Sequence, residues 1–235
     1  MNQKAVEIKN LSFSYPDGNE ALKDISFDVS AGESLGIIGP NGAGKSTLIL
    51  HLNGILRNKG SVIIFGLGME DKNLPEIRAD VGMVFQDPDN QLFMPEVFDD
   101  VSFGPINMGW DKKSVEEAVH QALKDVDMAY AERRLSHHLS FGEKKRVCLA
   151  TVLSMKPRIL ALDEPSSNLD PRHKRDLINF LKKFSATKII ATHDLGLVLE
   201  TCSRVILLDK GRIVAQGEAS SILKDTNLLE KHNLE

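Results

Sequence analysis

Residues 39–46 read Gly39-Pro40-Asn41-Gly42-Ala43-Gly44-Lys45-Ser46. The stretch lies between an apolar run at 34–38, typical of a buried strand, and an apolar run at 47–52, typical of a helix. A glycine-rich loop that ends in Lys-Ser between a strand and a helix is the pattern of a phosphate-binding loop. The alternative is a turn that only joins the strand to the helix. The Lys-Ser-Thr sequence at the end of the loop, and the strand-like and helix-like runs on its two sides, disfavour this alternative. The stretch therefore predicts that the chain binds a nucleoside triphosphate.

Each residue type in this loop has a defined use at a phosphate. The three glycines let the backbone curl so that successive N–H groups point at phosphate oxygens, and the positive end of the new helix favours anions. Lys45 can reach the β- and γ-phosphates, and the Ser46 hydroxyl can ligate Mg²⁺. The residues expected to bind the nucleoside triphosphate are Gly39, Pro40, Asn41, Gly42, Ala43, Gly44, Lys45, Ser46 and Thr47.

The composition narrows the classes of function. The chain has 235 residues, 26% of them charged, and a formal net charge of −4. This length suits one large domain or a domain with a subdomain, and the charge indicates no basic face for nucleic acid. No apolar run approaches the ~18 residues of a membrane-spanning helix, and the polar N-terminus does not resemble a signal peptide. If the protein works at a membrane, we expect another chain to hold it there.

The two cysteines and a histidine pair offer little chemistry. Cys148 and Cys202 each lie in an apolar stretch without a C-x-x-C partner. We interpret both as reduced packing residues of a cytosolic protein, in preference to a redox or metal role. His137 and His138 are expected in a solvated turn, since no acid or cysteine completes a set of metal ligands beside them.

The apolar pattern predicts an α/β fold. Residues 5–30 alternate between apolar and polar and are broken by Pro16-Asp17-Gly18, which predicts antiparallel strands joined by a turn. Short continuous apolar runs elsewhere are typical of strands covered on both faces, with helices between them. We expect a mostly parallel core sheet with an antiparallel flank. The runs lie at 62–65, 81–85, 159–162, 188–191 and 205–208.

Between Gln86 and Lys156 the pattern changes to helices and loops. Ser114-Val115-Glu116-Glu117 has the form of a capping box that opens a helix. We expect a helical lobe, residues 87–155, inserted into a core of residues 1–86 and 156–235. One apolar stripe is predicted along this helix, formed by Val115, Val119, Ala122, Leu123 and Val126.

A second acidic motif completes a nucleotide site. The apolar run at 159–162 leads into Asp163-Glu164-Pro165, a strand that ends in two adjacent carboxylates. Since adjacent strand residues face opposite sides, the two acids can have different roles. Asp163 is expected to hold Mg²⁺, and Glu164 to polarise the water that attacks the γ-phosphate. A solvated pair of acids at a strand end is the alternative, and the phosphate-binding loop upstream disfavours it.

Residues 139–146, Leu-Ser-Phe-Gly-Glu-Lys-Lys-Arg, precede an apolar helix and resemble the signature motif of ATP-binding-cassette (ABC) ATPases, Leu-Ser-Gly-Gly-Gln. Phe141 and Glu143 depart from that form, whereas Ser140 and Gly142 keep it. A serine and a glycine at a helix N-terminus are also physically suited to an anion. The resemblance implies the P-loop NTPase fold of this family. It further implies a head-to-tail homodimer in which Ser140, Phe141, Gly142 and Glu143 face the partner's ATP.

The same resemblance implies roles for five further positions, and all but His193 have an ordinary structural alternative. Tyr15 matches the aromatic residue that stacks on adenine, or it packs at a strand end. Gln86 matches the glutamine that contacts Mg²⁺ and water and links the core to the lobe, or it is solvated beside a turn. Asn168 and Asp170 match the loop at the dimer interface, and a helix N-cap before Pro171 is compatible with that role. His193 matches the histidine that contacts the γ-phosphate.

Within the ABC family, residues 84–93 are similar to the energy-coupling-factor importers, and residues 13–18 and 101–105 agree with this. That group includes CbiO- and NikO-like ATPases of cobalt and nickel importers, and ATPases of vitamin importers. Residues 165–172 favour the metal importers, and so does the chain's end about 20 residues after Gly211. We expect ATP and Mg²⁺ as cofactors and a peripheral location at the cytoplasmic face of the cell membrane. The expected partners are a transmembrane coupling protein and a substrate-binding membrane protein. A helix of the coupling protein is expected in a groove beside Gln86 and residues 87–103, and a simple exposed loop is the alternative for that segment.

Other classes of ABC ATPase fit less well. A DNA-repair type would carry a long coiled coil between Gln86 and Ser140, and a translation-factor type would have two cassettes in one chain. A module that binds ATP without hydrolysis would lack Glu164 or His193, and both are present.

Overall fold

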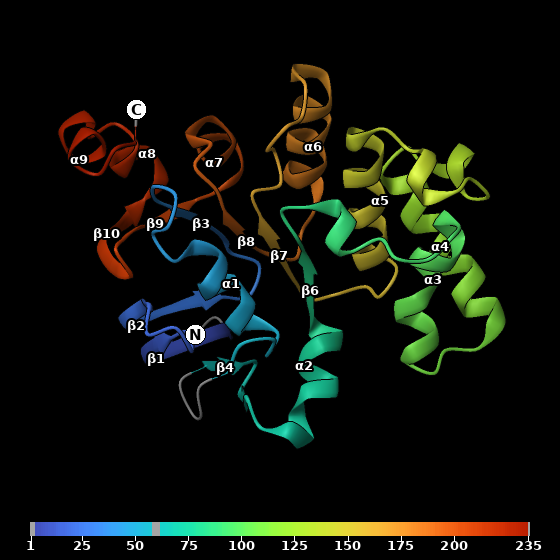
Figure 1. Ribbon diagram of the computed structural model, residues 1–235, viewed down its shortest axis with the longest axis horizontal. Coiled ribbons are helices and arrows are strands. Elements are labelled where there is room, and N and C mark those ends of the chain that lie inside the picture. The colour runs from blue at the N-terminus through green and yellow to red at the C-terminus, as the bar shows by residue number, and fades with distance from the viewer. Residues whose placement is uncertain (1–2, 58–61, 235) are drawn as a thin grey trace.

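Two β-sheets and the helices packed on them form the fold, which the computed structural model describes for residues 3–57 and 62–234 (Figure 1). The larger sheet has the strand order β10-β9-β3-β8-β7-β6 and is parallel except for β10. Its strands are β3 (Ser34–Ile38), β6 (Val81–Val84), β7 (Ile159–Asp163), β8 (Thr187–Ala191), β9 (Arg204–Asp209) and β10 (Arg212–Glu218). The predicted mostly parallel core sheet is confirmed.

The smaller sheet is antiparallel and has the order β2-β1-β4-β5. Its strands are β1 (Lys4–Ser14), β2 (Glu20–Ser30), β4 (Val62–Ile64) and β5 (Leu67–Gly68). The predicted turn at Pro16-Asp17-Gly18 joins β1 to β2, with the Gly18 N–H donating to the Tyr15 carbonyl. The antiparallel flank is therefore confirmed.

One strand was assigned to the wrong sheet. The run at 62–65 was predicted to be covered on both faces, but β4 pairs with β1 in the antiparallel sheet. Ile63 is only partly buried while its neighbours Val62 and Ile64 are fully buried, as expected when one face packs on the core. A run of four apolar residues does not distinguish these cases.

Helices cover both faces of the larger sheet (Figure 1). Successive residues along the parallel strands pack into two separate apolar cores, one on each face of the sheet. Ile37 and Ala161 lie in the core shared with the antiparallel sheet, and Ile38 and Leu162 lie in the core on the opposite face. Cys148 and Cys202 are buried free thiols in this second core, as predicted. The helices are α1 (Lys45–Leu52), α2 (Leu74–Asp80), α3 (Val97–Asn107), α4 (Lys112–Asp125), α5 (Phe141–Leu153), α6 (Pro171–Lys183), α7 (Leu195–Thr201), α8 (Ala219–Ile222) and α9 (Thr226–Lys231).

Helices α3, α4 and α5 pack on one another beside β6, at the right of Figure 1, and are called the lobe helices below. They fall within the interval predicted for a helical lobe, 87–155; the exact division into core and lobe stays a prediction. Among residues 3–57 and 62–234, no helix combines the length and apolarity required to cross a membrane.

The start of α4 differs from the prediction. The helix begins at Lys112, and its N-cap is Asp111, whose carboxylate accepts from the N–H groups of Lys113 and Ser114 at 3.1 Å. Ser114 is instead inside the first turn, and its hydroxyl donates to Asp111. Both side chains are suitable caps, and the carboxylate three residues earlier takes the position. The predicted stripe is confirmed, since Val115, Val119, Ala122, Leu123 and Val126 are all buried.

The contact between β6 and α5 predicts a sensitive position. A Cβ atom at Gly82 would lie 2.1 Å from Val152 Cγ1 and 2.9 Å from the Pro157 ring. We expect Gly82→Ala to lower the free energy of unfolding by about 1–3 kcal/mol, because the core is overpacked. Gly68→Ala, where a Cβ would meet nothing within 4 Å, is the matched control and should change little. Urea unfolding of both variants measures this, and equal stability of the two would contradict the packing.

Candidate functional site

The predicted site residues come from the ends of adjacent strands. The carboxyl ends of β3, β8, β7 and β6 lie at one edge of the parallel sheet, where ligands commonly bind. A cavity of about 660 Å³ opens at this edge. It is lined by most of the residues predicted to bind ATP or to act on it: Tyr15, Asn41, Gly42, Ala43, Gly44, Lys45, Ser46, Thr47, Gln86, Glu164, Asn168 and His193.

The phosphate-binding loop joins β3 to α1 and requires glycine for two different reasons. Gly44 has a φ of 104°, which side-chain-bearing residues rarely adopt. A Cβ atom at Gly39 would lie 2.1 Å from the Leu208 carbonyl oxygen, so the loop passes too close to β9 for any other residue. Lys45 begins α1 and is buried; its Nζ donates to the carbonyls of Gly39 at 2.8 Å and Pro40 at 3.2 Å.

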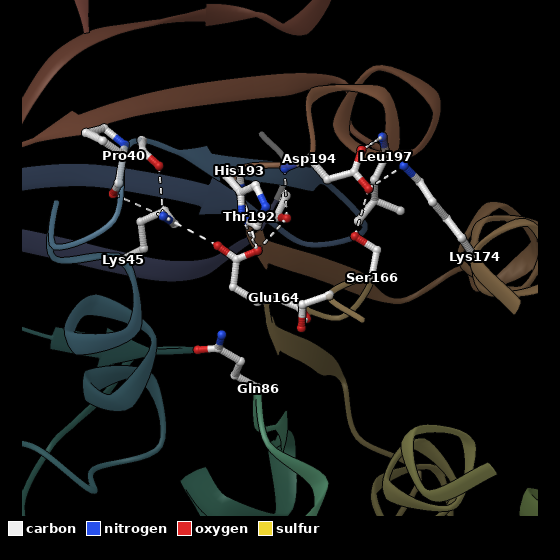
Figure 2. Close-up of polar contacts among 12 residues, drawn as sticks. Pro40, Lys45, Gln86, Glu164, Ser166, Lys174, Thr192, His193, Asp194 and Leu197 are labelled. Carbon is white, nitrogen blue, oxygen red and sulfur yellow. Dashed lines mark hydrogen bonds and ion pairs between the residues drawn. The ribbon is translucent and has the colours of Figure 1, made fainter. Parts of the chain in front are cut away.

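Glu164 is at the centre of the polar contacts (Figure 2). Its carboxylate lies 3.4 Å from Lys45 Nζ and 2.9 Å from His193 Nδ1, and it accepts from the Thr192 hydroxyl at 2.9 Å. The residue is only 5% exposed. One carboxylate therefore contacts the phosphate-binding loop and the end of β8 together. Thr192 was not predicted as a site residue, although it directly precedes His193.

The backbone conformation explains why the adjacent side chains of Asp163 and Glu164 have different orientations. We expected both on one strand, but β7 ends at Asp163. Glu164 has a φ of 44°, in the left-handed region, so the chain turns at this residue instead of alternating. The Glu164 N–H donates to the Ala191 carbonyl of β8 at 2.8 Å, which holds the turn against the sheet.

Asp163 and Ser46 lie together beside Glu164. Burial raises the pKa of Asp163, and a hydrogen bond from Ser46 acts in the opposite direction. Asp163 Oδ1 is buried without a hydrogen-bond partner among the described residues. A hydroxyl, a carboxylate with a free oxygen and the nearby Gln86 amide are oxygen ligands, which a hard divalent cation prefers. The residues predicted for Mg²⁺, Ser46, Gln86 and Asp163, thus fit such an ion.

Tyr15 and Gln86 both line the cavity. The Tyr15 ring contacts Phe13 edge to face, and its hydroxyl lies 3.0 Å from Thr47 Oγ1. Gln86 follows β6, and its side chain extends toward Glu164 in Figure 2. Stacking of Tyr15 on adenine stays a prediction.

The signature residues do not line this cavity. Ser140 is the N-cap of α5 and forms a complete capping box with Glu143. The Glu143 carboxylate also accepts from the Tyr130 hydroxyl at 2.7 Å and from Arg134 at 3.1 Å, and these contacts lower its pKa to about 2, with the Tyr130 hydrogen bond the largest cause. Phe141 is partly exposed. Within one chain, the signature residues therefore lie outside the cavity that the phosphate-binding loop lines.

The side chain of His173 lies close to both Gly142 and Asp170. A Cβ atom at Gly142 would lie 3.2 Å from His173 Nδ1, and that nitrogen is 2.6 Å from Asp170 Oδ2. Asp170 is the N-cap of α6, which confirms the structural alternative for this residue. Asn168, two residues earlier, lines the cavity. The segment therefore joins the cavity to the signature end of α5.

His137 and His138 lie in a short 3₁₀ turn with their rings in contact, and both are exposed. Within the described residues, no cluster of three His, Cys, Asp or Glu side chains could hold a metal ion.

Comparisons with known proteins agree with this geometry. A family model described as ABC transporter matches residues 22–167. The energy-coupling factor transporter ATP-binding protein EcfA of Carboxydothermus hydrogenoformans is 50% identical over 98% of this chain and 86% of its own length. The protein of that name from Methanocaldococcus jannaschii is 46% identical over 97% of this chain and 84% of its own.

Solved structures give the same result. The structure of cbiO1 from Clostridium perfringens, part of the ABC transporter complex cbiONQ, is 37% identical and has a TM-score of 0.84 over 99% of this chain and 96% of that chain. A dimeric ATP-binding cassette in a post-hydrolysis state, bound to ADP and Pi, is 25% identical with a TM-score of 0.83 over 91% of this chain and 98% of that one. The chain therefore belongs to the ABC transporter family, as an ATP-binding subunit.

Proposed function

We propose that the chain is the ATP-hydrolysing subunit of an energy-coupling-factor importer. The observation that carries this proposal is the buried Glu164 carboxylate, held by Lys45, Thr192 and His193 beside the phosphate-binding loop. The likeness to two EcfA proteins over almost the whole chain supports the importer type. The proposed reaction is ATP + H₂O to ADP + phosphate.

Three residues have direct roles in this reaction. Lys45 contacts Glu164 at 3.4 Å, and the γ-phosphate of ATP would compete for the same ammonium. Glu164 is then free to accept a proton from water as the water oxygen bonds to the γ-phosphorus and the bond to the bridging oxygen breaks. His193 would contact the γ-phosphate while its Nδ1 stays 2.9 Å from the Glu164 carboxylate. Mg²⁺, when held by Ser46, Gln86 and Asp163, would offset the charge of the phosphates.

A second copy of the chain completes each site in this proposal. Ser140 and Gly142 lie at the N-terminus of α5, where backbone N–H groups favour an anion. They are absent from the cavity of their own chain, and a head-to-tail homodimer would bring them to the partner's γ-phosphate. Phe141 and Glu143 border the same contact, and Asn168 and Asp170 lie on the loop between the two sites. The related cassette solved as a dimer with ADP and Pi supports this arrangement.

A groove beside Gln86 is the proposed contact with a transmembrane coupling protein. It has a volume of about 840 Å³ and lies between α2, β6, α3 and α5. Phe93 and Phe103 stack edge to face in it and are 64% and 45% exposed, and Ile55 is also exposed. Exposed apolar side chains grouped in a groove suit the apolar face of a helix. The lobe, residues 87–155, would move against the core, residues 1–86 and 156–235, and act on that helix.

Cobalt or nickel is the proposed cargo, with a vitamin as the alternative. The likeness to cbiO1, part of the cbiONQ complex, supports the metal, whereas the EcfA relatives keep the vitamin open. A substrate-binding membrane protein would hold the cargo, so this chain never touches it. The subunit would then be peripheral, at the cytoplasmic face of the cell membrane, with no nucleic acid as partner.

Two substitutions test the hydrolytic site. Glu164→Gln should keep ATP affinity, trap an ATP-bound dimer and lower kcat by about 10²–10⁴, the range of general-base effects. Lys45→Ala should weaken ATP binding by about tenfold or more, since a charge-assisted contact is lost. Phosphate release, equilibrium binding of labelled ATP and size-exclusion chromatography measure these effects. Normal turnover by Glu164→Gln would exclude Glu164 as the base.

Mixing two inactive variants tests the shared site. Lys45→Ala removes the phosphate contact of one chain, and Ser140→Arg blocks the signature of another. Each alone should be inactive, but a mixed dimer contains one site with an intact loop and an intact signature, so the mixture should regain turnover. Thermal unfolding of Ser140→Arg checks that the chain still folds. No recovery from two folded variants would argue against a site shared between chains.

The groove prediction concerns the membrane partner. Phe103→Ser should reduce co-purification with the coupling protein at least about fivefold, because burial of an aromatic side chain contributes roughly 1.5–3 kcal/mol. The ATPase rate of the isolated subunit should be unchanged. Leu199→Ser, at an apolar residue of α7 that is 55% exposed, is the matched control. Uptake of labelled cobalt, nickel or a vitamin by vesicles carrying the complex identifies the cargo. Equal co-purification of both variants would place the partner elsewhere.

A further inference from the structure

A buried lysine on α5 has no part in the roles described so far. Lys145 lies one helical turn after Phe141 and is only 5% exposed. Among the described residues it forms no ion pair; its Nζ donates to the carbonyl oxygens of Gln86 at 2.5 Å and Glu164 at 3.3 Å. Both partners are main-chain atoms of residues in the candidate site. The ammonium also lies 5.8 Å from the centre of the Phe141 ring.

Burying this ammonium group opposes folding, so its position needs a physical reason. Lysine is almost never fully buried unless its charge is compensated. Burial lowers the pKa of Lys145, whereas the negative charges of Asp163, Asp87 and Glu164 act against that shift. An apolar side chain of similar length would fill the same space without this cost. The two carbonyl contacts are what the ammonium adds.

The contact with Glu164 is made at a strained point of the backbone. The φ of 44° at Glu164 costs about 1–3 kcal/mol for a residue with a side chain. Its carbonyl accepts from the N–H and hydroxyl of Ser167, at 3.2 and 2.8 Å, and these donors lie on the same turn. Lys145 is the donor that reaches this carbonyl from the lobe helices. It thus connects the turn that aims the Glu164 carboxylate to a different part of the molecule.

Helix α5 joins Lys145 to the signature residues. The helix begins with the signature residues, and Lys145 follows Phe141 by four positions, on the same face. A shift of the N-terminal end of α5 would move Lys145 against the carbonyls of Gln86 and Glu164. Helix α5 therefore connects the residues that would face the partner's ATP to the residues that act on the chain's own ATP.

We propose that Lys145 is a positioning residue that links the signature end of α5 to the backbone of Glu164 and Gln86 in the same chain. Contact of the signature with the partner's ATP then sets the geometry of hydrolysis in this chain, which makes the two sites of a dimer cooperative. This inference rests on the proposed function, in which Glu164 is the base and the signature faces a second copy.

Lys145→Met tests the link, since it keeps length and apolar volume and removes both carbonyl contacts. Lys145→Arg is the conservative variant, because guanidinium can still donate to the two carbonyls. Lys113→Met, an exposed position on α4, is the matched control for the same exchange. The measurements, on the full chain, are ATP affinity, kcat, KM, the Hill coefficient for ATP and thermal unfolding.

We expect Lys145→Met to bind ATP within twofold of the unsubstituted protein, to lose at least about tenfold in kcat and to have a Hill coefficient near one. Lys145→Arg should restore part of the rate and of the cooperativity. Retained kcat and cooperativity in Lys145→Met would overturn the proposal. So would loss of stability and ATP binding together in both Lys145 variants, since this indicates a purely structural role.

The failure of this inference is distinguishable from failure of the proposed function. Glu164→Gln in the otherwise unsubstituted chain reports on the base independently of Lys145. If Glu164→Gln is inactive and Lys145→Met turns over normally, only the link is wrong. If Glu164→Gln hydrolyses ATP normally, Glu164 is not the base, and the link is overturned with that assignment. If the unsubstituted chain hydrolyses no ATP, the proposed function itself is wrong.

Discussion

The candidate site depends on the contact between Lys45 Nζ and Glu164 Oε1, 3.4 Å apart and both buried. A buried ion pair contributes little to stability, since both charges lose their hydration. Its importance is positional: it ties the first residue of α1 to the turn after β7, while Thr192 and His193 tie the same carboxylate to β8. A phosphate that attracts Lys45 would remove Lys45 as a partner of Glu164. Ligand binding would therefore directly change the contacts of the proposed base.

This contact is possible because of the strand order. Neighbouring parallel strands β3, β8 and β7 end at one edge, so residues separated by more than a hundred positions in the chain meet there. Each strand is covered on both faces, which fixes its register through two apolar cores. A slip of one residue would exchange Ile37 with Ile38 and Ala161 with Leu162 between these cores. The packing of the sheet therefore sets the positions of Lys45, Glu164 and His193 relative to one another.

Much of this could be predicted from the sequence, because the phosphate-binding loop and the strand-end acids are local patterns in which residue type determines backbone shape. The parallel core, the antiparallel flank and the stripe from Val115 to Val126 followed from periodicity for the same reason. The sheet assignment of β4 did not, since a run of four apolar residues does not define a face. Nor did the cap at Asp111, where two suitable residues compete, or the roles of Thr192 and Lys145, which exist only through contacts distant in sequence.

Glu143 shows how a departure from a motif can keep its physical function. A negative charge close to the proposed anion site would oppose a phosphate. Here the carboxylate accepts from Tyr130, Arg134 and the Ser140 N–H, and its pKa is lowered to about 2. Because the folded-state pKa lies below the ordinary value, these contacts stabilise the fold above pH ~4.5, and that contribution is lost as the pH falls toward 2. At neutral pH the charge is satisfied within its own chain, and it holds Ser140 at the start of α5, where the motif requires that residue.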